Sequence, residues 1–192
     1  MPPLPRHAHT CYARRMEYYV LQVKTAYEDK YLSGIEQKLL FRAEKQRFFL
    51  PKRKLSIRRG GKIIVEERPI FGGYVFLQTD VIDREIFDIA RKTPYFSKFL
   101  HSNQNIVPLR EKDFEIIRHF DKFGTADVSK VVFDENDKIV VLEGPLKGLE
   151  GYIIKVNKRK GRAKIRLPFS NENFLLDLGF NAIKPLEKTG TP

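Results

Sequence analysis

Apolar residues in the first two thirds of the chain follow two spacings, one typical of strands and one typical of helices. Tyr27, Tyr31, Ile35 and Leu39 recur every four residues, which predicts an amphipathic helix. Continuous β-rich runs instead predict buried strands at residues 17–24, 48–50 and 74–78. The same criteria predict helices at 83–92 and 111–123, a hairpin of 54–58 and 62–65 turning at Gly60-Gly61, and short strands at 99–100 and 106–107. This alternation predicts an α/β sandwich, an antiparallel sheet with about three helices.

The pattern changes after Gly124. Residues 124–135 are mostly polar, which favours a linker. Beyond them the helical spacing disappears, and short strands are predicted at 138–142, 152–156, 163–167 and 174–176, separated by turn residues such as Gly144-Pro145 and Ser170-Asn171. This pattern of short strands and turns predicts a small five-stranded β-barrel, which we expect to keep its β-structure in all states. The chain is therefore predicted to be an α+β protein of two domains.

The amino-terminal segment differs from both predicted domains. Residues 1–15 hold three prolines and little periodicity, so we expect a disordered tail, and Met16 is a candidate for the true start. The single cysteine, Cys11, excludes an internal disulfide. No apolar run approaches the ~20 residues of a membrane span, and the tail lacks the apolar core of a signal peptide. These features predict a cytoplasmic protein with no membrane association.

The charge of the chain points to a polyanionic partner. It holds 36 Lys and Arg against 24 Asp and Glu, a formal net charge of +12. Residues 42–62 contain nine cations and one acid, Glu44. A second cluster contains no acid and consists of Lys155, Lys158, Arg159, Lys160, Arg162, Lys164 and Arg166.

The second cluster has a predictable geometry. Alternate residues of a strand share a face, so Arg162, Lys164 and Arg166 would point outward while Ala163 and the residues that alternate with them enter the barrel. The neighbouring cations from 158 to 160 would lie on the adjoining turn. We call these seven residues the basic ridge, and they are candidates for phosphate contacts, with a solvated turn as the alternative.

Catalytic and cofactor motifs are absent from the sequence. There is no phosphate-binding loop, and no Gly-x-Ser-x-Gly sequence of the kind that presents a nucleophile. The four histidines are scattered, and one cysteine cannot build an ordinary zinc site. We therefore expect no cofactor and no metal, and a protein that acts by binding rather than by catalysis.

Three segments resemble a known family in the expected order. Residues 17–25 and 67–77, the latter reading Glu-Arg-Pro-Ile-Phe-Gly-Gly-Tyr-Val-Phe-Leu, resemble the opening strand and signature of the NusG amino-terminal (NGN) domain. Residues 137–152 resemble the KOW motif of its carboxy-terminal domain. The resemblance implies an NGN domain at 16–123, a linker at 124–135 and an SH3-like KOW barrel at 136–187. Gly72 stands where the signature usually has proline, and the chain has no tryptophan.

Membership of this family implies a transcription factor that binds RNA polymerase. The NGN domain would contact the β′ clamp helices and reach the β subunit. Phe71, expected to be exposed, is the leading contact candidate, with Ile70, Tyr74 and Tyr18 or Tyr19 nearby; Tyr74 and one of those two tyrosines are also expected to be core residues. Cations of the first cluster, including Arg53, Arg58 and Arg59, would lie near upstream or non-template DNA. The protein is expected to be a monomer.

The cations after the first KOW hairpin resemble the LoaP-type members, which are specialised antiterminators whose KOW domain recognises a leader RNA hairpin. The basic ridge is then the expected RNA site. The alternative is a general NusG elongation and termination factor whose KOW domain contacts a termination factor or a ribosomal protein. A ribosome-associated RNA-binding protein that uses the barrel alone is a third possibility, against which the signature at 67–77 argues.

Overall fold

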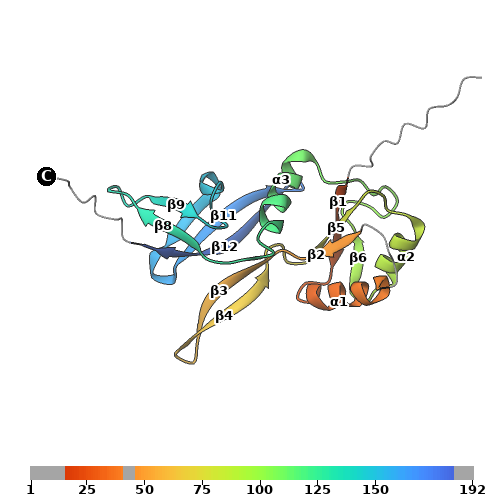
Figure 1. Ribbon diagram of the computed structural model, residues 1–192, viewed down its shortest axis with the longest axis horizontal. Helices are drawn as coiled ribbons and strands as arrows, with labels where there is room; N and C mark the ends of the chain where they lie inside the picture. The colour runs from red at the N-terminus through yellow and green to blue at the C-terminus, as the bar shows by residue number, and fades with distance from the viewer. Residues whose placement is uncertain (1–15, 41–45, 184–192) are drawn as a thin grey trace, which may run out of the picture.

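The computed structural model describes residues 16–40 and 46–183. The predicted tail, Arg42, Lys45 and the last residues of the predicted KOW segment lie outside this part of the chain. The described residues form an amino-terminal domain of three helices and two sheets, followed by a carboxy-terminal domain of five strands (Figure 1). The predicted α+β class is confirmed.

The amino-terminal domain is built on an antiparallel sheet in the order β2-β5-β1-β6. Its strands are β1 (Glu17–Val23), β2 (Arg47–Phe49), β5 (Tyr74–Thr79) and β6 (Phe96–Phe99). Alternate side chains of the two central strands enter two different cores: Leu21 and Leu77 pack on one face, and Val20 and Phe76 on the other. Both faces are covered, which explains why these strands read as continuous apolar runs.

The three helices follow the predicted apolar spacing. Helix α1 (Glu28–Leu39) and helix α2 (Arg84–Lys92) cover one face of the sheet, and Tyr31 and Ile35 of α1 are fully buried there. Asp83 caps α2 by accepting a hydrogen bond from the backbone N–H of Ile86 at 2.7 Å. Helix α3 (Glu111–Asp121) lies on the other face and directs Ile117 and Phe120 into the core.

A long hairpin extends away from the body of the molecule (Figure 1). It consists of β3 (Lys52–Arg59) and β4 (Lys62–Pro69), and β7 (Thr125–Ala126) pairs in parallel with the base of β3. Gly60 and Gly61 both have positive φ, as the predicted two-residue turn requires. The strand β4 is an edge of this three-stranded sheet.

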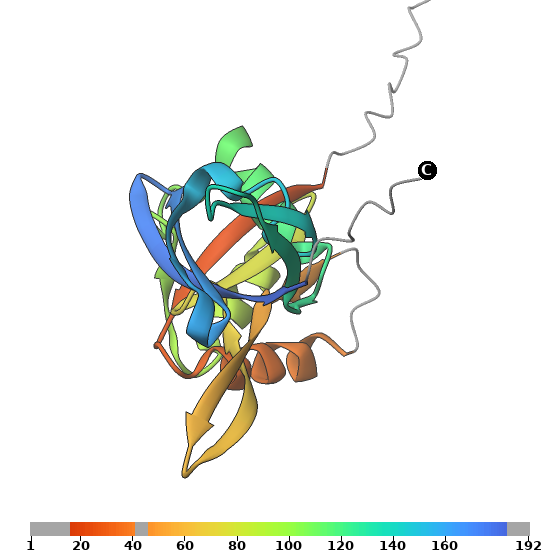
Figure 2. The same ribbon diagram turned by 90° about the vertical axis from the view of Figure 1, so that its left-hand side faces the viewer.

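The carboxy-terminal domain is a five-stranded sheet in the order β10-β11-β12-β8-β9 that curls into a barrel (Figure 2). Its elements are β8 (Ser129–Phe133), β9 (Ile139–Glu143), η1 (Glu150–Tyr152), β10 (Ile153–Asn157), η2 (Lys158–Lys160), β11 (Arg162–Phe169) and β12 (Glu172–Ala182). Gly144 has φ +99°, and a Cβ there would lie 2.7 Å from the Cα of Ser129, so the predicted glycine turn leaves no room for a side chain. The predicted β-barrel is therefore present.

Three sequence expectations differ from the structure. The predicted linker, 124–135, contains β7 and β8, because Val131 and its neighbours pair with β12 and enter the core. The strand predicted at 174–176 lies in the first half of the eleven-residue β12. Residues 106–107, predicted as a strand, have no strand partner and form a loop instead, with Val107 exposed.

Candidate functional site

Phe71 is buried, which corrects the expectation that it is exposed. Its side chain has 0% accessibility and follows β4 in the turn that leads to β5. Phe76 and Phe120 contact it from its own domain, while Phe169 and Phe174 cover it from the carboxy-terminal domain, with ring centroids 5.1 and 5.5 Å away. Rings from both domains therefore bury Phe71.

The other predicted contact residues occupy different environments. Ile70 is buried at 4% accessibility, and Tyr74 is half-buried against Phe169 and Phe174. Tyr18 is half-buried and packs on Phe49 and Phe114.

Tyr19 lies on the opposite face of the sheet from this aromatic contact. It belongs to the core under α1 and α2, as expected of one of the two tyrosines. Burial, followed by the hydrogen bond that its hydroxyl donates to Glu17, raises the pKa of Tyr19 to about 12. The structure thus brings together Ile70, Phe71 and Tyr74 beneath the carboxy-terminal domain, and it separates Tyr19 from them.

The tip of the β11–β12 hairpin is the part of the carboxy-terminal domain that packs on Phe71. Ser170 and Asn171 form a two-residue turn with positive φ at both positions, which places Phe169 and Phe174 on either side of the tip. The backbone N–H of Ser170 donates to Asp113 Oδ1 of α3 at 3.0 Å. A second polar contact joins His119 Nε2 to the backbone oxygen of Pro145 at 2.8 Å. We call the packing of Phe169 and Phe174 on Phe71 and Tyr74 the aromatic interface. Through it, the two domains share one continuous buried cluster.

The predicted alternation along β11 is confirmed. Ala163, Ile165 and Leu167 are fully buried in the barrel, while Lys164 and Arg166 are exposed on the outer face. Arg162 differs from them because it is half-buried, and its Nη2 donates to the backbone oxygen of Ser56 on β3. The outer face of β11 therefore presents cations on a rigid core, as the sequence predicted.

The turn next to β11 supplies three more cations of the basic ridge, and the seventh, Lys155, is exposed on β10. Lys158, Arg159 and Lys160 form the exposed turn η2, which Asn157 caps by accepting from the backbone N–H of Lys160 at 2.9 Å. Lys158 is drawn away from the others, since its ammonium pairs with Asp137 and lies 3.9 Å from the centroid of the Phe133 ring.

Three of the seven described cations of the first cluster pair with acids. Arg47 pairs with Asp121, Lys52 with Asp29 and Lys54 with Asp127. Arg53 is half-buried. Arg58, Arg59 and Lys62 remain at the exposed hairpin tip, and none of them pairs with an acid of the described residues.

Phe169, Phe174 and Asp113 form the aromatic interface without having been predicted to do so. The sequence signal is one phenylalanine on each side of Ser170-Asn171, directly before the turn at Phe169 and three residues after it at Phe174. Ring pairs of this kind stabilise a contact beyond the area they bury, but barrel interiors also use phenylalanine. The sequence therefore cannot distinguish the two uses.

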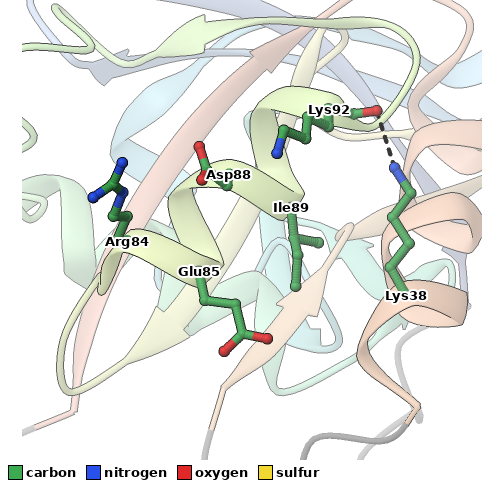
Figure 3. Close-up of a pocket in the computed structure, with 6 residues that line it drawn as sticks. All are labelled: Lys38, Arg84, Glu85, Asp88, Ile89 and Lys92. Carbon is green, nitrogen blue, oxygen red and sulfur yellow. Dashed lines mark hydrogen bonds between the residues drawn. The ribbon is translucent and has the colours of Figure 1, made fainter.

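A depression of about 520 Å³ lies between α1 and α2, on the far side of the sheet from the aromatic interface (Figure 3). Charges of both signs surround Ile89, and Lys38 Nζ donates to the backbone oxygen of Lys92 at 3.0 Å. In the part of the chain that the structure describes, no three His, Cys, Asp or Glu side chains gather as metal ligands. None of the described helices is long and apolar enough to cross a membrane.

Comparison with known proteins identifies the family. Residues 16–118 match the family model described as "Transcription termination factor nusG". Proteins named "Transcription termination/antitermination protein NusG" are similar along almost their whole length: that of Thermus thermophilus is 24% identical over 88% of this chain and 97% of its own, and that of Synechocystis is 26% identical over 87% and 88%. A solved structure, "Domain interaction in Thermotoga maritima NusG", shares the fold with a TM-score of 0.55 at 20% identity, covering 86% of this chain and 94% of that one. Since the family model spans more than half of the sequence, the chain belongs to the NusG family of transcription termination and antitermination factors.

Proposed function

We propose that this chain is an elongation and antitermination factor that binds RNA polymerase through its amino-terminal domain and nascent RNA, in the form of a leader hairpin, through the basic ridge. It acts by binding and not by catalysis. The observation that carries the RNA assignment is the outer face of β11 and the turn η2. There, Lys164 and Arg166 stand exposed above fully buried neighbours, and Arg159 and Lys160 lie exposed on the adjoining turn.

This surface suits a phosphate backbone for two physical reasons. Its cations are exposed, so they can reach phosphates and release the counterions that are condensed on the nucleic acid. Lys164 and Arg166 also lie on a strand whose inward-facing residues are fully buried. The backbone is therefore already ordered, and RNA binding loses little backbone entropy. Contacts of this kind supply affinity that falls steeply with salt.

RNA binding is tested by fluorescence anisotropy with a labelled RNA hairpin and a single strand of equal length, over a salt series. We expect the hairpin to bind more tightly than the single strand. Replacing Arg159, Lys164 and Arg166 with alanine should remove most of this binding and lower the slope of log K against log salt by about three units.

The matched control removes three exposed cations, Arg91, Lys92 and Lys98, at the opposite end of the molecule (Figure 1). This control should bind RNA almost as the unmodified chain does. Equal losses of RNA affinity in the two triple variants would show that binding depends on net charge and not on the basic ridge. The RNA assignment would then fail.

Polymerase binding is proposed for the face that contains Ile70, Phe71 and Tyr74. A buried aromatic cluster next to a turn is a suitable centre for a protein interface once it is uncovered. Phe169 and Phe174 occupy that face in this structure. A polymerase surface would therefore have to displace the β11–β12 tip, and the free energy of domain separation would be subtracted from its affinity.

The substitution Phe174→Ala tests this face in the full chain. It removes one ring of the aromatic interface, so we expect tighter binding to RNA polymerase, because less free energy is needed to part the domains. Leu175→Ala is the control, since Leu175 is the next residue of β12 and is 58% exposed. Unchanged or weaker polymerase binding by the Phe174 variant would show that polymerase contacts another surface.

The alternative is a general NusG factor whose carboxy-terminal domain contacts a termination factor or a ribosomal protein. The names of the relatives, which include both termination and antitermination, favour this alternative. RNA binding that is weak and indifferent to RNA structure would support it over the specialised function.

A further inference from the structure

A cleft separates the β3–β4 hairpin from the carboxy-terminal domain. Its volume is about 550 Å³. One wall comes from the amino-terminal domain and the other from η2 and the start of β11; the lining residues are Ser56, Ile57, Arg58 and Ile63 on the first wall and Arg159, Lys160 and Arg162 on the second. Figure 1 shows the hairpin projecting from the junction between the domains, with the base of β3 near β12. The cleft exists only because the two domains are docked.

The lining of this cleft is strongly positive. Four cations face it and no acid does. A smaller hollow of about 180 Å³ shares Lys160 and Arg162 with the cleft and adds Lys155 and Lys164, with Asp177 as its one acid. The two hollows form a continuous basic track that runs from the hairpin of the first domain onto the outer face of β11.

Guanidinium groups at this junction have unsatisfied hydrogen-bonding capacity. Arg162 uses Nη2 to reach Ser56, but its buried Nε has no acceptor among the described residues. Arg53 Nε and Nη1 are in the same condition. Burial lowers the pKa of Arg53; Asp177 opposes this, and the Arg68 and Arg162 cations add to it. Buried donors without acceptors are rare because they cost free energy, and an anion that enters beside them removes part of that cost.

We infer that this cleft is a nucleic-acid groove in which both domains hold the phosphate backbone of one RNA, with Arg58 of the hairpin facing Arg159, Lys160 and Arg162. The inference rests on the proposed RNA-binding function and extends it to the amino-terminal domain. Arginine favours phosphate because its planar donors match two oxygens at once. An RNA backbone offers such oxygens at regular intervals along both walls.

A groove with walls from two domains couples RNA binding to domain docking. RNA that contacts both walls binds the docked arrangement more tightly than the separated one, so it shifts the population toward docking. The aromatic interface should then open less often while RNA is bound. RNA and polymerase would favour opposite arrangements of the same chain.

The test is RNA affinity of the full chain carrying Arg58→Ala, measured by anisotropy with the same labelled hairpin over a salt series. We expect binding several-fold weaker and a salt slope lower by about one unit, as for the loss of one phosphate contact. Arg91→Ala is the matched control because it removes the same residue type from an exposed position on the same domain, outside the cleft. Its affinity should equal that of the unmodified chain.

The possible outcomes separate this inference from the proposed function. If Arg58→Ala behaves like Arg91→Ala while the triple variant of the basic ridge loses RNA, the carboxy-terminal domain binds RNA alone and the groove is refuted. If the unmodified chain binds no RNA, the proposed RNA function fails as well. Poly-glutamate that binds as tightly as the hairpin, with the same dependence on Arg58, would overturn RNA as the ligand.

Hydrogen–deuterium exchange supplies an independent readout of the coupling. With the RNA hairpin bound, amides of the β11–β12 tip and of the turn at Phe71 should exchange more slowly than in the free chain. In the Arg58→Ala variant, saturated with the same RNA, this protection should be smaller. Faster exchange at the aromatic interface on RNA binding would refute the coupling.

Discussion

Two hairpins, one from each domain, lie at the junction between the domains, and they differ in what they offer. Both close through a two-residue turn with positive φ at each position, Gly60-Gly61 in β3–β4 and Ser170-Asn171 in β11–β12. The second buries Phe169 at 1% accessibility against the opposite domain. The first exposes Ile63 and holds Arg58 beside an open cleft. The same type of turn therefore belongs to a buried contact between the domains in β11–β12 and to an exposed, charged surface in β3–β4.

This difference indicates which part of the junction stabilises the docked domains and which part is open to ligands. The aromatic interface excludes water and gains from close ring contacts. The cleft remains open and lacks acceptors for its buried donors. The aromatic interface should hold the domains together, and the cleft should respond to ligands.

The largest expected effect is at the buried tip. Phe169→Ala removes a ring that contacts Phe71, Phe76 and Phe174, and it should destabilise the chain by about 3–5 kcal/mol through lost burial and the cavity left behind. Urea unfolding followed by circular dichroism measures the change. A loss below about 1 kcal/mol would indicate a loosely packed interface and remove the contrast between the hairpins.

A smaller effect is expected for the hydrogen bond beside that tip. Asp113→Ala leaves the backbone N–H of Ser170 without its acceptor and should cost about 1 kcal/mol. Asp113→Asn retains an oxygen acceptor and should recover part of the loss. Urea unfolding of the three chains compares their stabilities. Equal stabilities of the alanine and asparagine variants would mean that the bond does not contribute.

Low pH should slightly destabilise the base of the β3–β4 hairpin. Asp127 accepts from the Val128 N–H at 2.8 Å and from Lys54 Nζ at 3.1 Å, and these bonds, in that order, lower its pKa below 3.8. A lowered folded-state pKa stabilises the folded chain above about pH 4, and this contribution disappears as the pH falls through the folded value. Asp127→Asn should therefore cost under about 0.5 kcal/mol at neutral pH and nothing in strong acid. Thermal unfolding of both chains from pH 2 to 7 tests this sign, and a gap that widens in acid would contradict it.

The smallest effect is expected on the exposed edge. Ile63 is 69% exposed, so Ile63→Ala should change the free energy of unfolding by no more than about 0.5 kcal/mol. The same urea titration that measures Phe169→Ala provides the comparison. A loss as large as that of Phe169→Ala would show that β4 is packed in solution.

Short-range patterns predicted the local elements well because their causes are local. The four-residue spacing of Tyr31 and Ile35 predicted α1, and alternation along β11 predicted that Ala163, Ile165 and Leu167 are buried. The prediction of a linker at 124–135 missed that these residues form β7 and β8, because such short strands acquire their order from distant partners, β3 and β12.

The candidate site divides in the same way. The outward direction of Lys164 and Arg166 follows from the period of a strand, which needs only their neighbours. The position of Arg58 opposite Arg159 depends on how two domains dock across about one hundred residues of chain, and no local pattern contains that information.

The sequence by itself determined the family signature, the two-domain order of elements, the basic ridge and the two hairpin turns, since each depends on residues close together in the chain. Tertiary structure alone decided that Phe71 is buried and that a basic cleft lies between the domains. Both follow from the docking of the β11–β12 tip onto the amino-terminal sheet. The reason is physical: an aromatic residue next to a turn is equally suited to an internal interface or an external one, and only the surface that packs against it determines which it becomes.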